Sequence, residues 1–205
     1  MALTMSIAVV EGLSGRQVAD RLGAELTEET VSFYAAVPAV TTHSRYRTVV
    51  LDDPYDDAPA LEDEHVLARL SRVASVALFQ VNEHLGCGLY MAGCWADGVM
   101  AWKVTHCREE PETEELEVLG VPPVGFAAIA GSSRAKQAQA DAAADATGDY
   151  ICHLGGAVVD LFALVTGIEF YSPSPGWWEK LAYSVLRPRN EGPENGQVSG
   201  ICDPT

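Results

Sequence analysis

Histidine and cysteine side chains gather around one predicted hairpin, and imidazole and thiolate are the usual zinc ligands in proteins. The five candidates are His84, Cys87, Cys94, His106 and Cys107. Strand residues rise about 3.3 Å each, so Cys94 near the hairpin tip and Cys107 near its open end lie too far apart to share one ion. The chain also has no Cys-x-x-Cys pair. We therefore predict no metal site.

A second set of polar side chains suggests an acid–base pocket. His153 and Asp160 are seven residues apart in an apolar stretch that reads as a buried helix, so they share one face of it. A carboxylate that orients an imidazole is a general-base arrangement, but these two are about 10 Å apart along the helix axis. A small-molecule enzyme or binding protein with a pocket near His106, His153 and Asp160 is the alternative function. The other interpretation of His106 is a buried core histidine.

The familiar catalytic signatures are missing. The sequence contains no Gly-x-Ser-x-Gly elbow, phosphate-binding loop, dinucleotide-binding glycine pattern or His-Glu-x-x-His. We predict no catalytic residue and no cofactor, and an enzyme is the less favoured class.

Acidic residues dominate the charge, with 29 Asp and Glu against 13 Lys and Arg and a net charge of −16. Such a chain repels nucleic acids and anionic membranes, whereas a basic protein partner is compatible with it. The acidity also favours solubility, and both interpretations stay open at this point. Two acidic loops and nearby aromatic residues supply the expected partner contacts: Asp52, Asp53, Tyr55, Asp56, Asp57, Glu109, Glu110, Glu112 and Trp177.

The sequence favours a cytoplasmic location. Its first residues lack the basic segment and cleavage site of a secretory signal, and no apolar run approaches the roughly 20 residues that span a bilayer. Its five cysteines are widely spaced and odd in number, as expected of reduced thiols.

The hairpin is the clearest local structure. Asp97-Gly98 separates two runs of aliphatic and aromatic residues, as in a two-residue turn with positive φ at both positions. Alternation after the turn places Met100, Trp102, Val104 and His106 on one inward face. In this register Trp102 lies opposite Gly93.

Apolar periodicity predicts the remaining elements. In chain order they are a strand at 6–10, a helix at 15–25, strands at 31–37 and 46–51, a helix from 62 to about 79, the hairpin at 86–107, a helix from Ser132 or Ser133 to about 146, a buried helix at 149–165 and a strand or short helix at 181–186.

This order predicts the α+β class rather than a regular βαβ alternation. We expect a single domain over residues 1–187, with an antiparallel sheet, a central Asp-Gly hairpin and helices packed on one face. Residues 188–205 are rich in Pro, Gly, Asn and Glu and are expected to form a flexible tail.

Several short motifs resemble one family. They are Trp95-x-Asp97-Gly98-x-x-x-Trp102-x-Val104-x-His106, Gly120-x-Pro122-Pro123, Asp149-Tyr150-Ile151 and Leu164-x-Thr166-Gly167. In its middle and C-terminal half the chain resembles small bacterial cytosolic proteins of the immunity-protein type, which accompany polymorphic toxins. This resemblance implies a protein that neutralises a cognate toxin, with a basic toxin domain as its partner. It implies no catalytic residues, and the oligomeric state stays open.

Overall fold

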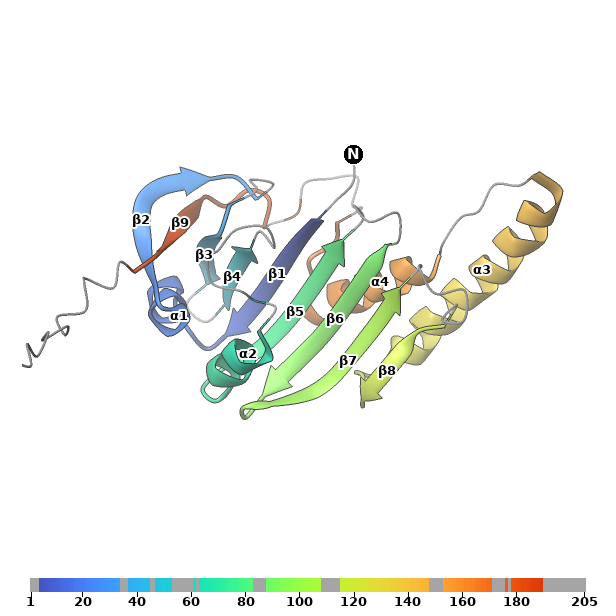
Figure 1. Ribbon diagram of the computed structural model, residues 1–205, viewed down its shortest axis with the longest axis horizontal. Coiled ribbons are helices and arrows are strands. Elements are labelled where there is room, and N and C mark those ends of the chain that lie inside the picture. The colour runs from blue at the N-terminus through green and yellow to red at the C-terminus, as the bar shows by residue number, and fades with distance from the viewer. Residues whose placement is uncertain are drawn as a thin grey trace, which may run out of the picture.

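The structure is a single antiparallel sheet with helices on both faces (Figure 1). The computed structural model describes residues 4–33, 37–44, 47–52, 61, 63–82, 88–107, 115–147, 153–170, 176 and 178–189. Within these residues the nine strands follow the order β2-β9-β3-β4-β1-β5-β6-β7-β8. Their bounds are β1 (Thr4–Glu11), β2 (Ala24–Val31), β3 (Ala39–Ser44), β4 (Arg47–Asp52), β5 (Ser75–Asn82), β6 (Leu89–Ala96), β7 (Val99–Cys107), β8 (Glu117–Gly120) and β9 (Tyr183–Pro188).

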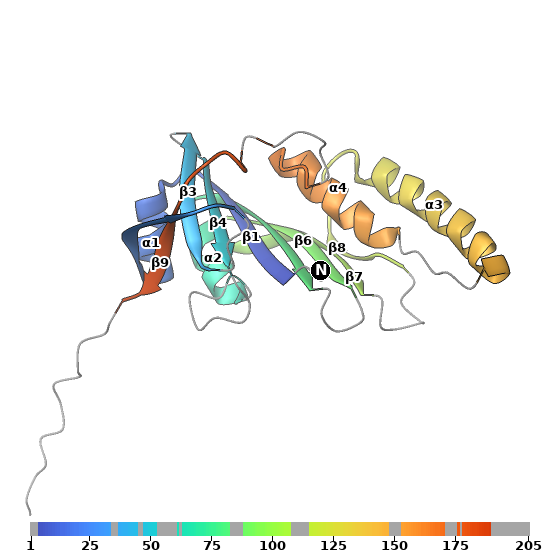
Figure 2. The ribbon, with the colours of Figure 1, turned by 90° about the horizontal axis from the view of Figure 1, so that it is seen from above.

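Four helices cover this sheet in the described part of the chain: α1 (Gly15–Leu22), α2 (Glu64–Ser71), α3 (Phe126–Thr147) and α4 (Leu154–Thr166). Helices α1 and α2 pack on one face, and α4 packs on the other with α3 alongside it (Figure 2). The predicted α+β class and antiparallel sheet are confirmed. The expectation that the helices share one face is wrong. None of the described helices is long and apolar enough to cross a membrane.

Strand β1 explains why both faces are covered. Its residues Ile7 to Val10 are all at most 2% exposed. Ile7 and Val9 belong to the hydrophobic cluster under α4, whereas Ala8 and Val10 belong to the cluster under α1 and α2. Successive side chains of a strand point to opposite faces, so a strand that is apolar at every position requires cover on both sides.

Two local predictions are confirmed in detail. The Ser14 hydroxyl oxygen caps α1 by accepting a hydrogen bond from the Gln17 backbone N–H. The Gln17 side-chain oxygen accepts a hydrogen bond from the Ser14 backbone N–H, which completes the capping box. At the hairpin turn Asp97 has a φ of 53° and Gly98 a φ of 79°, as the two-residue turn requires.

The hairpin differs from its prediction in position and register. Strand β7 pairs with the edge strand β8, β6 lies between β5 and β7, and β1 is the central strand. A bulge makes Trp95 pair with Met100 and Cys94 with Trp102, so Trp102 does not face Gly93. Because the bulge adds one residue to β7, Met100 packs in the cluster under α2 while Trp102 packs in the cluster under α4.

The predicted helix from residue 62 to 79 is also wrong beyond its first half. Helix α2 ends at Ser71, and Ser75–Asn82 forms β5, which pairs with β1 and β6. Residues Val76 to Phe79 are all buried, with alternate side chains in the two clusters. A short run that is apolar at every position satisfies helical and strand periodicity alike, so pairing with neighbouring strands decides between them.

Other predictions differ from the structure as follows. The 46–51 strand is β4. The strand expected at 31–37 is wrong: only Val31 belongs to a strand, as the last residue of β2, and Ser32, Phe33 and Val37 lie outside any strand, while residues 34–36 are not among those described. Helix α3 starts at Phe126, so Ser132 and Ser133 lie inside it and do not cap it. Strand β9 includes Pro188, and the Arg189 N–H donates to Gly23, so the folded part extends past residue 187. The expected tail otherwise lies outside the described residues.

Gly120 gives a test of the β7–β8 junction. Its φ is 73°, and an added Cβ would overlap the backbone carbonyl oxygen of Ala101. We expect Gly120→Ala to lower the free energy of unfolding by roughly 2–3 kcal/mol, because it adds backbone strain and a clash that no rotamer relieves. Urea unfolding measures this.

The matched control is Gly131→Ala in α3, where an added Cβ would meet nothing within 4 Å. This change should raise the free energy of unfolding by roughly 0.5–1 kcal/mol, because alanine is the better helix former. Equal effects of the two substitutions would contradict the described close approach at Gly120.

Candidate functional site

One end of the sheet receives three connections that together carry eight of the 29 acidic residues of the chain. Strands β4, β5 and β7 end there, and β6 and β8 begin there, beside the N-terminal end of β1 (Figure 1). Segments 53–60, 83–87 and 108–114 connect to these strand ends. We call this end of the sheet, defined by Asp52, Asn82, Leu89, Cys107 and Glu117, the acidic end.

Register fixes the alignment of these strands. A single row of paired residues crosses six strands, and its members are Asp52, Ser6, Gln80, Met91, Thr105 and Glu117. Ser6 shares the α2-facing side of β1 with Ala8, so the row lies on that face. Sheet pairing therefore brings together positions far apart in the sequence.

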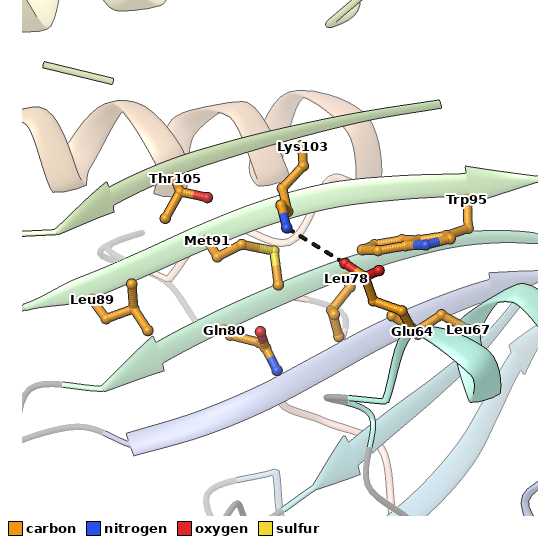
Figure 3. Close-up of a pocket in the computed structure, with 9 residues that line it drawn as sticks. All are labelled: Glu64, Leu67, Leu78, Gln80, Leu89, Met91, Trp95, Lys103 and Thr105. Atoms are coloured by element: carbon orange, nitrogen blue, oxygen red, sulfur yellow. Dashed lines mark hydrogen bonds and ion pairs between the residues drawn. The ribbon is translucent and has the colours of Figure 1, made fainter. Parts of the chain in front are cut away.

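A pocket opens on this face beside the N-terminal end of α2 (Figure 3). Its volume is about 230 Å³. Side chains from α2 and strands β5, β6 and β7 line it: Glu64, Leu67, Leu78, Gln80, Leu89, Met91, Trp95, Lys103 and Thr105. The wall is mainly aliphatic and aromatic, with four polar side chains among the apolar ones.

The polar groups of the pocket are only partly paired with one another. Lys103 Nζ lies 3.5 Å from Glu64 Oε1, and the Lys103 side chain is 27% exposed. Gln80 Nε2 donates to Ser6 Oγ at 3.3 Å, and Figure 3 shows the Gln80 amide oxygen turned toward the pocket. This arrangement suits binding of an apolar group with a polar rim, and it places no nucleophile beside a base.

Sequence reasoning missed this pocket because it assigned residues 62–79 to one helix. The error placed Leu78 and Gln80 after or within a helix, not on a strand beside Met91. The alternation along β7 did indicate part of the pocket. Lys103 and Thr105 alternate with Trp102 and Val104 of the cluster under α4, so they point to the opposite face of the sheet.

Asp52 is not the surface contact that the sequence suggested. It is 6% exposed, and its Oδ2 accepts a hydrogen bond of 2.7 Å from the buried Leu61 N–H. This hydrogen bond therefore connects the end of β4 to Leu61, which lies shortly before α2. The other proposed partner contacts, Asp53, Tyr55, Asp56, Asp57, Glu109, Glu110, Glu112 and Trp177, lie outside the described residues.

The alternative pocket near three polar residues is not assembled. His106 is 3% exposed on the α4-facing side of β7, where it pairs with Tyr90. The N–H of His153 donates to Gln137 Oε1 at 2.6 Å, next to the start of α4. Asp160 is exposed, so α4 separates its carboxylate from buried His106. The pocket in Figure 3 lies on the opposite face of the sheet.

The described cysteines do not gather either. Cys94 is half-buried, and burial raises the pKa of its thiol while the Ser75 hydroxyl partly opposes that shift. Among the described residues no three His, Cys, Asp or Glu side chains are placed to share a metal ion. His84 and Cys87 fall outside the described residues.

Comparison of the chain with family models, curated proteins and solved structures gives no match. The fold and the site together define an α+β protein with a small apolar pocket next to the acidic end of its sheet. Its function is therefore argued from that site.

Replacing Asp52 separates a structural role from a partner contact. Asp52→Ala removes the acceptor for the buried Leu61 N–H, so we expect the free energy of unfolding to fall by roughly 1–3 kcal/mol. Urea unfolding of the free protein measures this. Glu28→Ala on exposed β2 is the control and should stay within about 0.5 kcal/mol of the unchanged protein. An Asp52→Ala protein as stable as the original would refute the structural role.

Proposed function

We propose that the protein is an immunity-type inhibitor that binds and neutralises a basic toxin domain. The observation that carries this proposal is the convergence of the acidic connections at one end of the sheet. Complementary charge concentrated on one surface speeds association with an oppositely charged protein and orients the encounter.

The charge distribution supports this surface over others. Every Lys and Arg except Arg45 and Arg108 lies in the described residues. Several of them form surface ion pairs, such as Arg47 with Glu11 at 2.6 Å and Arg187 with Glu29 at 3.1 Å. Segments 53–60, 83–87 and 108–114 contain eight acidic residues and one arginine, so they contribute −7 of the net charge of −16 at the acidic end.

The pocket supplies the apolar part of the proposed contact. Binding energy at protein interfaces concentrates in a few anchor side chains that enter well-packed pockets. At about 230 Å³ the pocket is smaller than the ~300–1,000 Å³ of typical small-molecule sites, so one aromatic or long aliphatic side chain fits it better than a metabolite. The proposed partner presents such a side chain among basic residues.

Co-expression tests the function directly. Toxin-like domains encoded by genes that neighbour this one are produced alone and together with this chain, and cell survival is measured. We expect the chain to restore growth and to co-purify with the toxin domain. Failure of both protection and capture would overturn the proposal.

Charge variants then test the acidic end. Replacing Asp53, Asp56 and Asp57 by Asn should lower the association rate constant at least tenfold at low ionic strength, because it removes the steering charge. The difference should shrink at high salt, where screening acts within a few ångströms. Surface plasmon resonance with the immobilised toxin domain measures both.

The matched control removes three exposed charges elsewhere, by replacing Glu25, Glu28 and Glu169 with Gln. Two of these residues lie on β2, at the opposite edge of the sheet from β8. The control should retain most of the association rate. Equal losses for the two sets would mean that total charge, rather than the acidic end, governs association.

Filling the pocket tests the anchor separately. Thr105→Trp places a large side chain in the pocket, so we expect the toxin domain to dissociate at least tenfold faster with little change in association rate. Thr30→Trp on the exposed β2 edge is the matched control. Unchanged dissociation from the Thr105→Trp protein, with its fold retained by circular dichroism, would exclude the pocket from the interface.

A further inference from the structure

The pocket beside α2 holds one group of each charge. The Lys103 ammonium lies 3.5 Å from the Glu64 carboxylate, and Figure 3 shows this pair at the end of the pocket that Trp95 occupies. Because the two charges offset one another, a charged side chain that enters the pocket gains little net attraction and still loses its hydration. The pocket therefore favours an occupant without charge.

The floor of the pocket carries hydrogen-bonding groups on both sides of Met91. Gln80, Met91 and Thr105 belong to the row of paired residues that crosses β5, β6 and β7. Gln80 Nε2 donates to the buried Ser6 Oγ at 3.3 Å, and the Gln80 amide oxygen is turned toward the pocket as an acceptor (Figure 3). An occupant without a polar group would displace water from this oxygen and replace no hydrogen bond, which costs binding free energy.

The apolar wall suits an aromatic ring. Met91 is 9% exposed at the middle of the pocket, and Trp95, at 2%, lies at the end opposite Leu89 (Figure 3). Methionine sulfur and aromatic faces both make favourable contacts with a further ring. A volume of about 230 Å³ holds one such ring. The occupant is therefore neutral and aromatic, with a polar group on its ring.

We propose that the pocket binds a tyrosine side chain of the partner protein, with its ring against Met91 and its hydroxyl donating to the Gln80 amide oxygen. The inference rests on the proposed function and identifies the anchor residue of the partner. A phenolic hydroxyl also accepts hydrogen bonds, which Thr105 and Lys103 can donate, whereas an indole N–H only donates and a phenyl ring does neither. Gln80 is the specificity-determining residue, because a site that hydrogen-bonds a hydroxyl rejects the analogue without it.

Nuclear magnetic resonance titration of the full chain tests the pocket without any toxin. The probes are N-acetyltyrosinamide and N-acetylphenylalaninamide, which carry no charged termini and so resemble side chains within a protein. We expect the tyrosine probe to shift the Trp95 indole N–H and Met91 methyl resonances, with a dissociation constant at least about fivefold below that of the phenylalanine probe. Equal binding of the two probes, or no shift at these resonances, would overturn the proposal. Tighter binding of free tyrosine than of its capped form would also overturn it, in favour of a metabolite.

Gln80→Met removes the acceptor while it keeps a side chain of similar length. This substitution should raise the dissociation constant of the tyrosine probe at least about fivefold and leave that of the phenylalanine probe within about twofold. A purely structural role of Gln80 would weaken both probes alike and would contradict the assignment. Gln139→Met is the matched control, because Gln139 is exposed on α3, which lies with α4 on the other face of the sheet (Figure 2). This control should retain the preference for tyrosine.

The tyrosine site and the proposed function can fail separately. Thr105→Trp fills the pocket and should abolish the shifts from both probes, and shifts that persist in this protein would place the probes elsewhere and overturn the site. A chain that neutralises a toxin domain but binds both probes equally would overturn the tyrosine assignment alone. Selective binding of the tyrosine probe by a chain that protects no cell would support the pocket assignment and overturn the proposed function.

Discussion

The structure depends on a central strand that is buried on both faces. Because Ile7 and Val9 point one way and Ala8 and Val10 the other, β1 requires two separate hydrophobic clusters. Antiparallel pairing with β4 and β5 satisfies its backbone groups and aligns both neighbours in register. The other strands extend the sheet on either side of β1, and the helices cover its two faces.

The two clusters have different characters. The cluster under α4 is rich in aromatic rings, including Phe33, Phe79, Phe162, Trp178 and Tyr183. Burial raises the pKa of the Tyr183 phenol, whose hydroxyl donates to the Trp178 carbonyl at 2.9 Å. The cluster under α1 and α2 is mostly aliphatic and borders the pocket, which α2 lines on one side with Glu64 and Leu67. One face therefore holds the aromatic cluster, and the other contains the pocket that we propose as part of a binding surface.

Charge is uneven along the chain. Segments 53–60, 83–87 and 108–114 connect to strand ends near the pocket and carry eight acidic residues, whereas residues 118–133 carry no charged side chain. The surface that we propose for a basic partner is therefore the acidic end.

Local features of this protein could be predicted from its amino-acid sequence alone. The Asp97-Gly98 turn, the Ser14–Gln17 capping box and the α+β class depend on residues close together in the chain. The strand at residues 75–82 could be recognised only in the fold, because pairing with neighbouring strands sets the conformation of an apolar run. The fold also buries Asp52 against the Leu61 N–H, and the packing of α2 on the sheet brings Glu64 to Lys103 of β7 across 39 residues of sequence.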